Sequence, residues 1–375
     1  MNQNEVFADA LWVGAKEKDI CPVIRTSFDV SGRIKRATLR ILGLGTYVFY
    51  VNGKKATTDL FQPINSNYEH RDFPKGEIMA VRSYVNAYDV TQLLVTGKNT
   101  VATMLGNGWY DGTRQEKPFG DKKLCLSVEV ETDGGAYTFG SSLNDKYADT
   151  FVKKSNILEY EIHDYTEWDE SILYPEYDDS GLPNVIAAEP LNTEYYYSDC
   201  PRDTVIEEYT PRIVKKTEDA TVYDTGINMS GIPVLRSLGE AGKIRVCFSE
   251  ELTEDGEPEE KHSMWQSFEA TVGDKPTIIQ NVFSWYGFRY FKVEGKAEAV
   301  SVLRTHTDVA VTSSFESSDA TLNWIYDTYL NTQRCNMHHG IPGIRSSGCW
   351  MYRWRRVALI PSVKNLSTRC FIVAG

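Results

Sequence analysis

The chain has 375 residues, a formal net charge of −12, 41% hydrophobic residues and 25% charged residues. This length predicts two or three domains, and the composition is ordinary for a soluble globular protein. The excess of acids argues against a nucleic-acid partner, because phosphate binding needs a basic footprint.

Aromatic side chains are plentiful, with 22 Tyr, 15 Phe and 8 Trp. They fit β-rich structure, because aromatic and β-branched side chains suit a half-buried pleated surface. They also fit carbohydrate binding, since flat rings stack on sugar faces. For any single ring, a structural role is favoured.

The N-terminus has no basic segment followed by an apolar run, so we expect neither a signal peptide nor a membrane partner. The seven cysteines are odd in number and scattered, without a C-x-x-C pair. This pattern predicts reduced thiols in a cytoplasmic protein rather than disulfides or a zinc site. We expect no cofactor and no metal.

Residues 1–165 are predicted to form a first antiparallel β-sandwich, of the jelly-roll kind. Asn52-Gly53 follows two apolar runs and tolerates the positive φ angles of a tight hairpin turn. A second turn is expected at Asp133-Gly134-Gly135. It follows a stretch that alternates apolar and polar residues, as a half-buried strand does.

Three further segments follow in chain order. Residues 166–203 are rich in acids, Tyr and Pro and predict a loop-rich boundary. Residues 204–312 resume the strand pattern and predict a second β-sandwich. Residues 313–342 carry apolar side chains at helical spacing, and Ser318 or Asp319 can cap the helix N-terminus.

Several common sites are excluded by pattern. The chain lacks the glycine spacing of a dinucleotide or phosphate-binding loop, and it has no H-E-x-x-H. The adjacent pair His338-His339 is not expected to hold a metal, because neighbours on a helix face different directions.

The most suggestive local feature is the loop "LGNGWYDGTRQ", which follows a buried strand. Its glycines allow a sharp bend, and its aromatic and polar side chains could stack on a sugar and read its hydroxyls. The candidate carbohydrate-binding residues are Asn107, Trp109, Tyr110, Asp111 and Arg114. The alternative is a rigid loop whose Trp plugs the sandwich or packs against a neighbouring domain.

Several stretches resemble the N-terminal region of bacterial α-L-rhamnosidases, glycoside hydrolase family 78. The first sandwich matches through "RATLRILGLGTYVFYVNGKKA", "YDVTQLL" and "LGNGWYDG". The second matches through "YDTGINMSGIPVLR", "EELTEDGEP" and "WYGFRYFKVEG". The helical stretch resembles the segment that leads into the family's catalytic (α/α)6 barrel. The resemblance covers roughly residues 10–342.

The resemblance also implies where catalytic acids should begin. In the family, the block after this helix continues from a Pro, here Pro342, into an Asp-Cys-Pro run and further acids that line the catalytic pocket. Here Ile344, Cys349 and Arg356 stand near three of those acidic positions. Inverting hydrolysis needs an acid and a base roughly 6.5–9.5 Å apart. We therefore expect no catalytic residue in this chain, which would be truncated before the barrel.

Residues 343–375 are expected to be an aberrant, disordered tail. From residue 328 to 375 the chain holds seven basic residues and no Asp or Glu. Two interpretations stay open: a shifted reading frame or damaged gene, and a genuine divergent tail. Reading Trp350-Met351-Tyr352 one base later gives Gly-Cys and permits Thr, close to the family's Gly-Tyr-Thr but not identical with it.

The expected function is the non-catalytic part of an α-L-rhamnosidase, with a rhamnose-containing oligosaccharide or plant glycoside as partner. A stand-alone carbohydrate-binding module and purely structural support remain alternatives, and a homodimer is a further expectation. A calcium-dependent rhamnose-binding module of similar shape carries an Asp-Asn pair just before the matching strand. Gly45-Thr46 stands there, so we expect no calcium-bound sugar.

Overall fold

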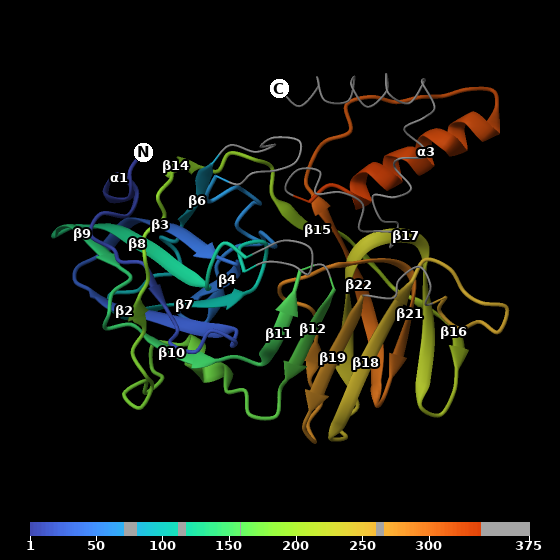
Figure 1. The fold of residues 1–375 in the computed structure, drawn as a ribbon, viewed down its shortest axis with the longest axis horizontal. Helices are drawn as coiled ribbons and strands as arrows, with labels where there is room; N and C mark the ends of the chain where they lie inside the picture. Colours follow the sequence, from blue (N-terminus) through green and yellow to red (C-terminus); the bar gives the residue numbers. More distant parts are fainter. Residues whose placement is uncertain (71–80, 112–117, 158, 260–265, 339–375) are drawn as a thin grey trace.

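The computed structural model describes residues 1–70, 81–111, 118–157, 159–259 and 266–338. These residues are mainly β, in two sandwich-like bodies that lie side by side, with one longer helix at an end of the second (Figure 1). The mainly β fold class predicted from the sequence is confirmed.

The first sandwich is built from two sheets. The seven-stranded sheet runs in the order β13-β1-β8-β3-β6-β14, with β9 paired to β8. Its strands are β1 (Val13–Gly14), β3 (Ile34–Leu44), β6 (Arg82–Asp89), β8 (Lys123–Thr132), β9 (Gly135–Gly140), β13 (Ile186–Ala187) and β14 (Glu194–Tyr197). The five-stranded sheet runs β10-β2-β7-β4-β5. Its strands are β2 (Pro22–Val30), β4 (Thr46–Val51), β5 (Lys54–Lys55), β7 (Gly97–Gly106) and β10 (Lys146–Asp149).

Both predicted hairpin turns are present in the first sandwich. Asn52 and Gly53 have φ angles of 51° and 78° and join β4 to β5. The turn after Thr132 joins β8 to β9. Alternating side chains of β3, β7 and β8 fill the core between the two sheets, as a strand with one buried face requires.

The second sandwich is one continuous ten-stranded ladder. Its strands are β11 (Val152–Asn156), β12 (Tyr160–Asp164), β15 (Asp203–Tyr209), β16 (Arg212–Lys216), β17 (Ala220–Ser237), β18 (Gly242–Ser249), β19 (Ser267–Val272), β20 (Ile278–Ile279), β21 (Tyr286–Glu294) and β22 (Ala297–Thr307). The first part of β17 pairs with β16 and β21, and its last part pairs with β22 and β20. The long strand β17 therefore connects the strands that pair with its first part to those that pair with its last part. Side chains from both parts of β17 lie in one apolar core.

The chain exchanges segments between the two bodies. The hairpin β11–β12, which the sequence analysis placed in the first sandwich, joins the ladder of the second through a parallel pairing with β19. The short strands β13 and β14, from the expected boundary 166–203, return to the first sandwich. β14 lies parallel to β6, so neither body is purely antiparallel. Strand pairing depends on distant partners, which a local strand pattern does not report.

Helices are few among the described residues. They are α1 (Gln3–Phe7), the 3-10 turn η1 (Glu170–Leu173) and α3 (Ala320–Cys335). The predicted cap of α3 is confirmed, since the backbone N–H of Thr321 donates to the Asp319 carboxylate at 2.8 Å. No helix of the described residues is long and apolar enough to cross a membrane.

The helix α3 is bonded to the second body near its C-terminal end. The side-chain amide of Asn331 donates to the backbone oxygen of Asn228, and Arg304 donates to Asn331. Of the apolar side chains that the spacing predicted to form one face, Leu322, Ile325 and Tyr329 are exposed to solvent, whereas Tyr326 and Leu330 are partly buried. Trp324, which lies outside that predicted face, is also exposed. Residues 339–375, which include His339 and the predicted tail, lie outside the described residues.

Candidate functional site

The loop after β7 was the sequence's candidate sugar site, and it packs tightly against its surroundings. The backbone N–H of Asn107 donates to Ser155 Oγ at 2.9 Å. Gly108 has a φ angle of 55°, and a Cβ placed there would lie 2.3 Å from the backbone oxygen of Gly45. Only glycine fits this close approach, so the loop is fixed against the start of β4.

Trp109 lies at the junction of the two bodies. Its partly buried ring packs against a buried cluster that draws on both of them: Phe61, Ile157, Ile232 and Trp285. This is the contact expected of a loop that packs against the neighbouring domain.

Tyr110 is buried in a different cluster. Its ring makes an edge contact with Tyr68, at a centroid distance of 5.1 Å, and stacks on Phe119 at 6.0 Å. Burial raises the pKa of Tyr110 to about 12, so its hydroxyl stays protonated near neutral pH.

The polar side chains of the loop converge on a lysine. Lys122 Nζ donates to the Asp111 carboxylate at 2.8 Å and to Asn107 Oδ1 at 3.4 Å. Burial raises the pKa of Asp111, against the opposing charge of Lys122. The structure therefore brings Asn107 and Asp111 together, while Trp109 and Tyr110 point into separate cores. Arg114 lies outside the described residues.

A fully buried carboxylate of the second body fixes the segment that contacts the first body. Glu161 on β12 accepts hydrogen bonds from the backbone N–H groups of Val282 and Phe283, at 3.0 and 2.8 Å, and from Ser284 Oγ at 2.6 Å. His163 Nε2 lies 2.8 Å from the same carboxylate. Burial on its own favours the neutral acid, but these bonds outweigh it and hold the pKa of Glu161 below its usual value.

The same segment plugs the first sandwich. The ring of Phe283, which follows Val282, packs in an apolar cluster with Val23, Met104 and Ile172. A Cβ at Gly106 would come within 2.5 Å of that ring, so the glycine makes room for it. The junction is thus a closed, packed contact.

A second buried carboxylate joins the junction to the end of α3. Asp203 accepts a hydrogen bond from Thr307 Oγ1 at 2.6 Å, and His338 Nδ1 lies 2.8 Å from its other oxygen. The His338 ring stacks on Trp285 with a centroid distance of 3.9 Å. Sequence reasoning missed Glu161, His163 and Asp203. The alternation in "YEIHD" could have been noticed, but its usual interpretation would bury the apolar residues.

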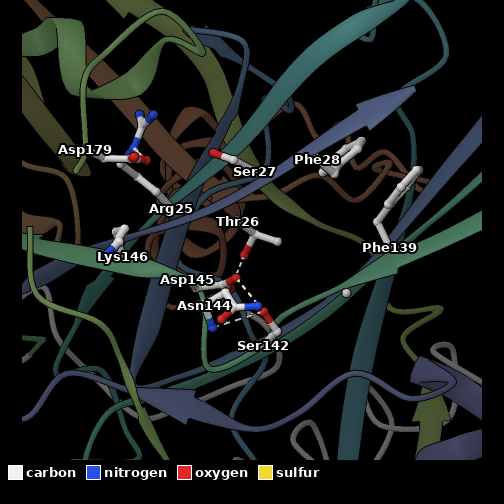
Figure 2. A pocket seen from close by; sticks show the side chains of 11 residues that line it. Arg25, Thr26, Ser27, Phe28, Phe139, Ser142, Asn144, Asp145, Lys146 and Asp179 are labelled. Atoms are coloured by element: carbon white, nitrogen blue, oxygen red, sulfur yellow. Dashed lines mark hydrogen bonds and ion pairs between the residues drawn. The ribbon is translucent and has the colours of Figure 1, made fainter. Parts of the chain in front are cut away.

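An edge of the first sandwich is open. β10 pairs with residues 22–25 of β2, so residues 26–30 form an edge of the five-stranded sheet within the described chain. This edge faces β9, and a cavity of about 250 Å³ lies between them (Figure 2). Phe28 and Phe139 stack across the two sheets at a centroid distance of 4.5 Å and form one wall.

The other wall of this cavity carries a buried acid, Asp145, which is 5% exposed. Thr26 Oγ1 donates to its Oδ2 at 2.5 Å and Ser142 Oγ to its Oδ1 at 3.2 Å. Burial raises the pKa of Asp145 to about 6. The neighbouring Lys146 directs its ammonium elsewhere, to Leu182 O and Asn184 Oδ1. No cation in the described part of the chain is paired with Asp145.

Gly45, which stands where the calcium-dependent rhamnose-binding module has an Asp, cannot be replaced by an acidic residue on this backbone. Gly45 has a φ angle of 70°, and a Cβ there would lie 1.9 Å from the backbone oxygen of Gly106. Across the described ranges, no group of three or more His, Cys, Asp or Glu residues could hold a metal ion.

Comparisons with known proteins agree on one family. The family model "Alpha-L-rhamnosidase N-terminal domain" matches residues 32–214, and the model "Bacterial alpha-L-rhamnosidase concanavalin-like domain" matches residues 214–315. An alpha-L-rhamnosidase of Formosa agariphila is 27% identical over 350 residues, which cover 85% of this chain and 35% of the relative. One from Alteromonas sp. (strain LOR) is 25% identical, over 85% of this chain and 37% of the relative.

Solved structures share the fold. An alpha-L-rhamnosidase from Dictyoglumus thermophilum matches with a TM-score of 0.80 and 24% identity, over 90% of this chain and 40% of that chain. The Streptomyces avermitilis enzyme matches with a TM-score of 0.77 and 24% identity, over 85% of this chain and 32% of that chain. The chain thus spans little more than a third of the length of the curated relatives it matches.

Proposed function

Because the chain belongs to the bacterial α-L-rhamnosidase family, we propose that its two β bodies form the non-catalytic part of such an enzyme. One observation carries the proposal: the family's N-terminal and concanavalin-like domains follow each other without a gap over residues 32–315. The likeness of fold over 90% of the chain supports it.

The complete enzyme would hydrolyse terminal α-L-rhamnosyl residues of plant glycosides or related oligosaccharides, with inversion at the anomeric carbon. That reaction needs one carboxylic acid to protonate the leaving oxygen and a second carboxylate to activate water. A helical domain that follows α3 would supply both. The Streptomyces avermitilis relative is described in complex with L-rhamnose, which supports rhamnose as the sugar.

The described residues would serve as a rigid support in such an enzyme. Hydrogen bonds to Glu161 fix residues 282–284 of the second body. The ring of Phe283 in that segment packs in an apolar cluster with side chains of the first body. The helix α3 is anchored at one end and presents exposed apolar side chains at the other, such as Trp324, which is 65% exposed. A helical domain packed there would bury them.

The described cavity does not offer the two carboxylates that hydrolysis requires. Asp145 and Asp179 both line it, but Asp179 accepts a hydrogen bond from Arg25 Nε at 3.1 Å and pairs with that charge. One carboxylate is left to act as acid or base, and inverting and retaining mechanisms both need two.

An activity assay tests the proposal. The purified 375-residue chain is incubated with an aryl α-L-rhamnoside, beside the full-length Formosa agariphila relative as a positive control. We expect no release of the aryl group above the buffer rate. Turnover that scales with chain concentration and stays with the protein through purification would overturn the proposal.

Sequencing the gene through and beyond codons 335–375, in all three frames, tests the shifted-frame hypothesis. If it is correct, a shifted frame restores an Asp-Cys-Pro run and stays open for the length of a barrel. If no frame does so, the divergent tail is the better account.

Sugar binding by the loop that carries Trp109 stays a prediction. Titration with L-rhamnose, followed by Trp fluorescence, tests it with Trp109→Ala as the comparison variant. A flat titration would remove this alternative. The cytoplasmic location and the homodimer also stay predictions, and sedimentation equilibrium tests the second.

A further inference from the structure

The geometry points to the open edge of the first sandwich, the cavity between β2 and β9, as a binding site for a single neutral sugar ring. This goes beyond the proposed function, because the support of a catalytic domain does not require the first sandwich to bind any ligand. Figure 2 shows Phe28 and Phe139 on one side of the cavity, with Thr26, Asp145 and Ser142 on the other.

The size of the cavity selects a small ligand. Its volume of about 250 Å³ is just below the roughly 300–1,000 Å³ of pockets that enclose drug-sized molecules. One monosaccharide ring fits this space better than a chain of sugars. The site lies along residues 26–30 of β2, which pair with β7 on one side and with no described strand on the other, so a ligand can enter without displacing a strand.

The apolar wall suits the hydrophobic face of a sugar. Phe28 is buried and fixes the plane of Phe139, which is only partly buried and lies nearly parallel to it, at an interplanar angle of 19°. A pyranose presents C–H groups on one face, and these pack against a flat ring. Two stacked rings that come from different sheets hold that surface rigid.

The polar wall offers hydrogen-bond acceptors that the protein leaves incompletely used. An ionised carboxylate accepts about four hydrogen bonds. Thr26 and Ser142 donate their hydroxyls to Asp145, and no cation of the described residues compensates its charge. A buried charge without an opposite charge is costly, and hydroxyl donors from a ligand would lower that cost.

The cavity also holds donors, which argues for a ligand that both donates and accepts. The guanidinium of Arg25 lies beside Asp179, on the other side of β2 from Thr26, and donates to Asp179 and to backbone oxygens, so it is not one of these donors. Asn144 is exposed at the rim and offers an amide. Lys146 disfavours a cationic ligand at the same place. A sugar, whose hydroxyls donate and accept, matches this mixture.

Isothermal titration calorimetry on the 375-residue chain tests the inference, with L-rhamnose, D-mannose and D-galactose as separate probes. We expect saturable binding of at least one of them, with a Kd on the order of 1 mM. Asp145→Asn and Asn144→Ala should each weaken it, the first by about tenfold. Asn144 is exposed, so its truncation leaves the fold intact and reports on binding alone.

Two variants serve as controls. Asp274→Asn makes the same chemical change at an exposed position of the second body, and Trp324→Ala removes an exposed ring of α3, away from the site. Both should bind as the parent chain does. The absence of heat with all three sugars, or binding that survives both Asp145→Asn and Asn144→Ala, would overturn the inference. Neither result bears on the proposed non-catalytic role, which the aryl rhamnoside assay tests separately.

Discussion

Two buried carboxylates, one at the junction of the two bodies and one at the open edge of the first sandwich, show how differently the same group can be used. Glu161 is enclosed at the junction, and His163, Ser284 and two backbone N–H groups satisfy it. Asp145 is nearly as buried at the open edge, where the hydroxyls of Thr26 and Ser142 and the backbone of Ser142 donate to it. Hydrogen bonds lower the pKa of Glu161, whereas burial raises that of Asp145 to about 6. The junction around Glu161 is therefore a closed contact, whereas Asp145 at the open edge can accept further hydrogen bonds.

The largest expected effect on stability comes from removing the Glu161 carboxylate at the junction. Glu161→Ala leaves two buried backbone N–H groups and His163 without their acceptor. We expect a loss of about 3–5 kcal/mol in the free energy of unfolding, measured by urea denaturation at pH 7. Glu298→Ala is the matched control, because its side chain is 54% exposed and loses about 0.5 kcal/mol or less. Equal losses in both variants would contradict the role given to Glu161.

The pH dependence of stability should separate the two carboxylates. A raised folded-state pKa contributes stability that is full below the unfolded value of 3.8 and is lost as pH rises through about 6. Between pH 4.5 and 7.5, the parent chain should therefore lose about 2 kcal/mol of its free energy of unfolding relative to Asp145→Asn. Paired urea titrations of the two proteins measure this difference.

Glu161 should show the opposite sign in the same titrations. Its lowered folded-state pKa contributes stability that is full above the unfolded value of 4.5 and is lost as pH falls below it. A stability difference between Asp145→Asn and the parent chain that does not change with pH would show that Asp145 is not desolvated.

The smallest expected effect is at the polar wall of the cavity, where Thr26 is buried. Thr26→Val removes one hydroxyl donor from Asp145 and keeps the shape of the side chain. We expect a loss of about 1.5 kcal/mol at pH 7.5, as for a hydrogen bond to a charged group, and less at pH 4.5, where Asp145 is protonated. Urea denaturation at the two pH values measures it. The account of the polar wall would be wrong if the loss were equal at both pH values.

Much of the fold could be predicted from local pattern. The hairpin at Asn52-Gly53 and the helix capped by Asp319 follow from residue preferences that act over a few positions. The exchange of β11–β12 into the second body could not be predicted in this way. Its pairing partner, β19, lies about a hundred residues away in the sequence.

The prediction of a functional site from the sequence was limited in the same way, because it depended on residues that are adjacent in the chain. The loop at Asn107–Asp111 was conspicuous because its residues are adjacent, and the structure uses them for packing and for an ion pair with Lys122. The open edge was missed because its residues are dispersed: Arg25 to Phe28, Phe139 to Lys146 and Asp179. The burial of Asp145 is a tertiary property that no local pattern encodes.

Hydrogen exchange with and without L-rhamnose, followed by mass spectrometry, tests the contrast between the junction and the open edge most directly. The account predicts that peptides containing Val282 and Phe283 exchange slowly in both conditions, because their N–H groups are bonded to Glu161. Peptides spanning residues 139–146 should slow only when the sugar is present. Protection gained at residues 107–111 instead, with no change at 139–146, would contradict the account.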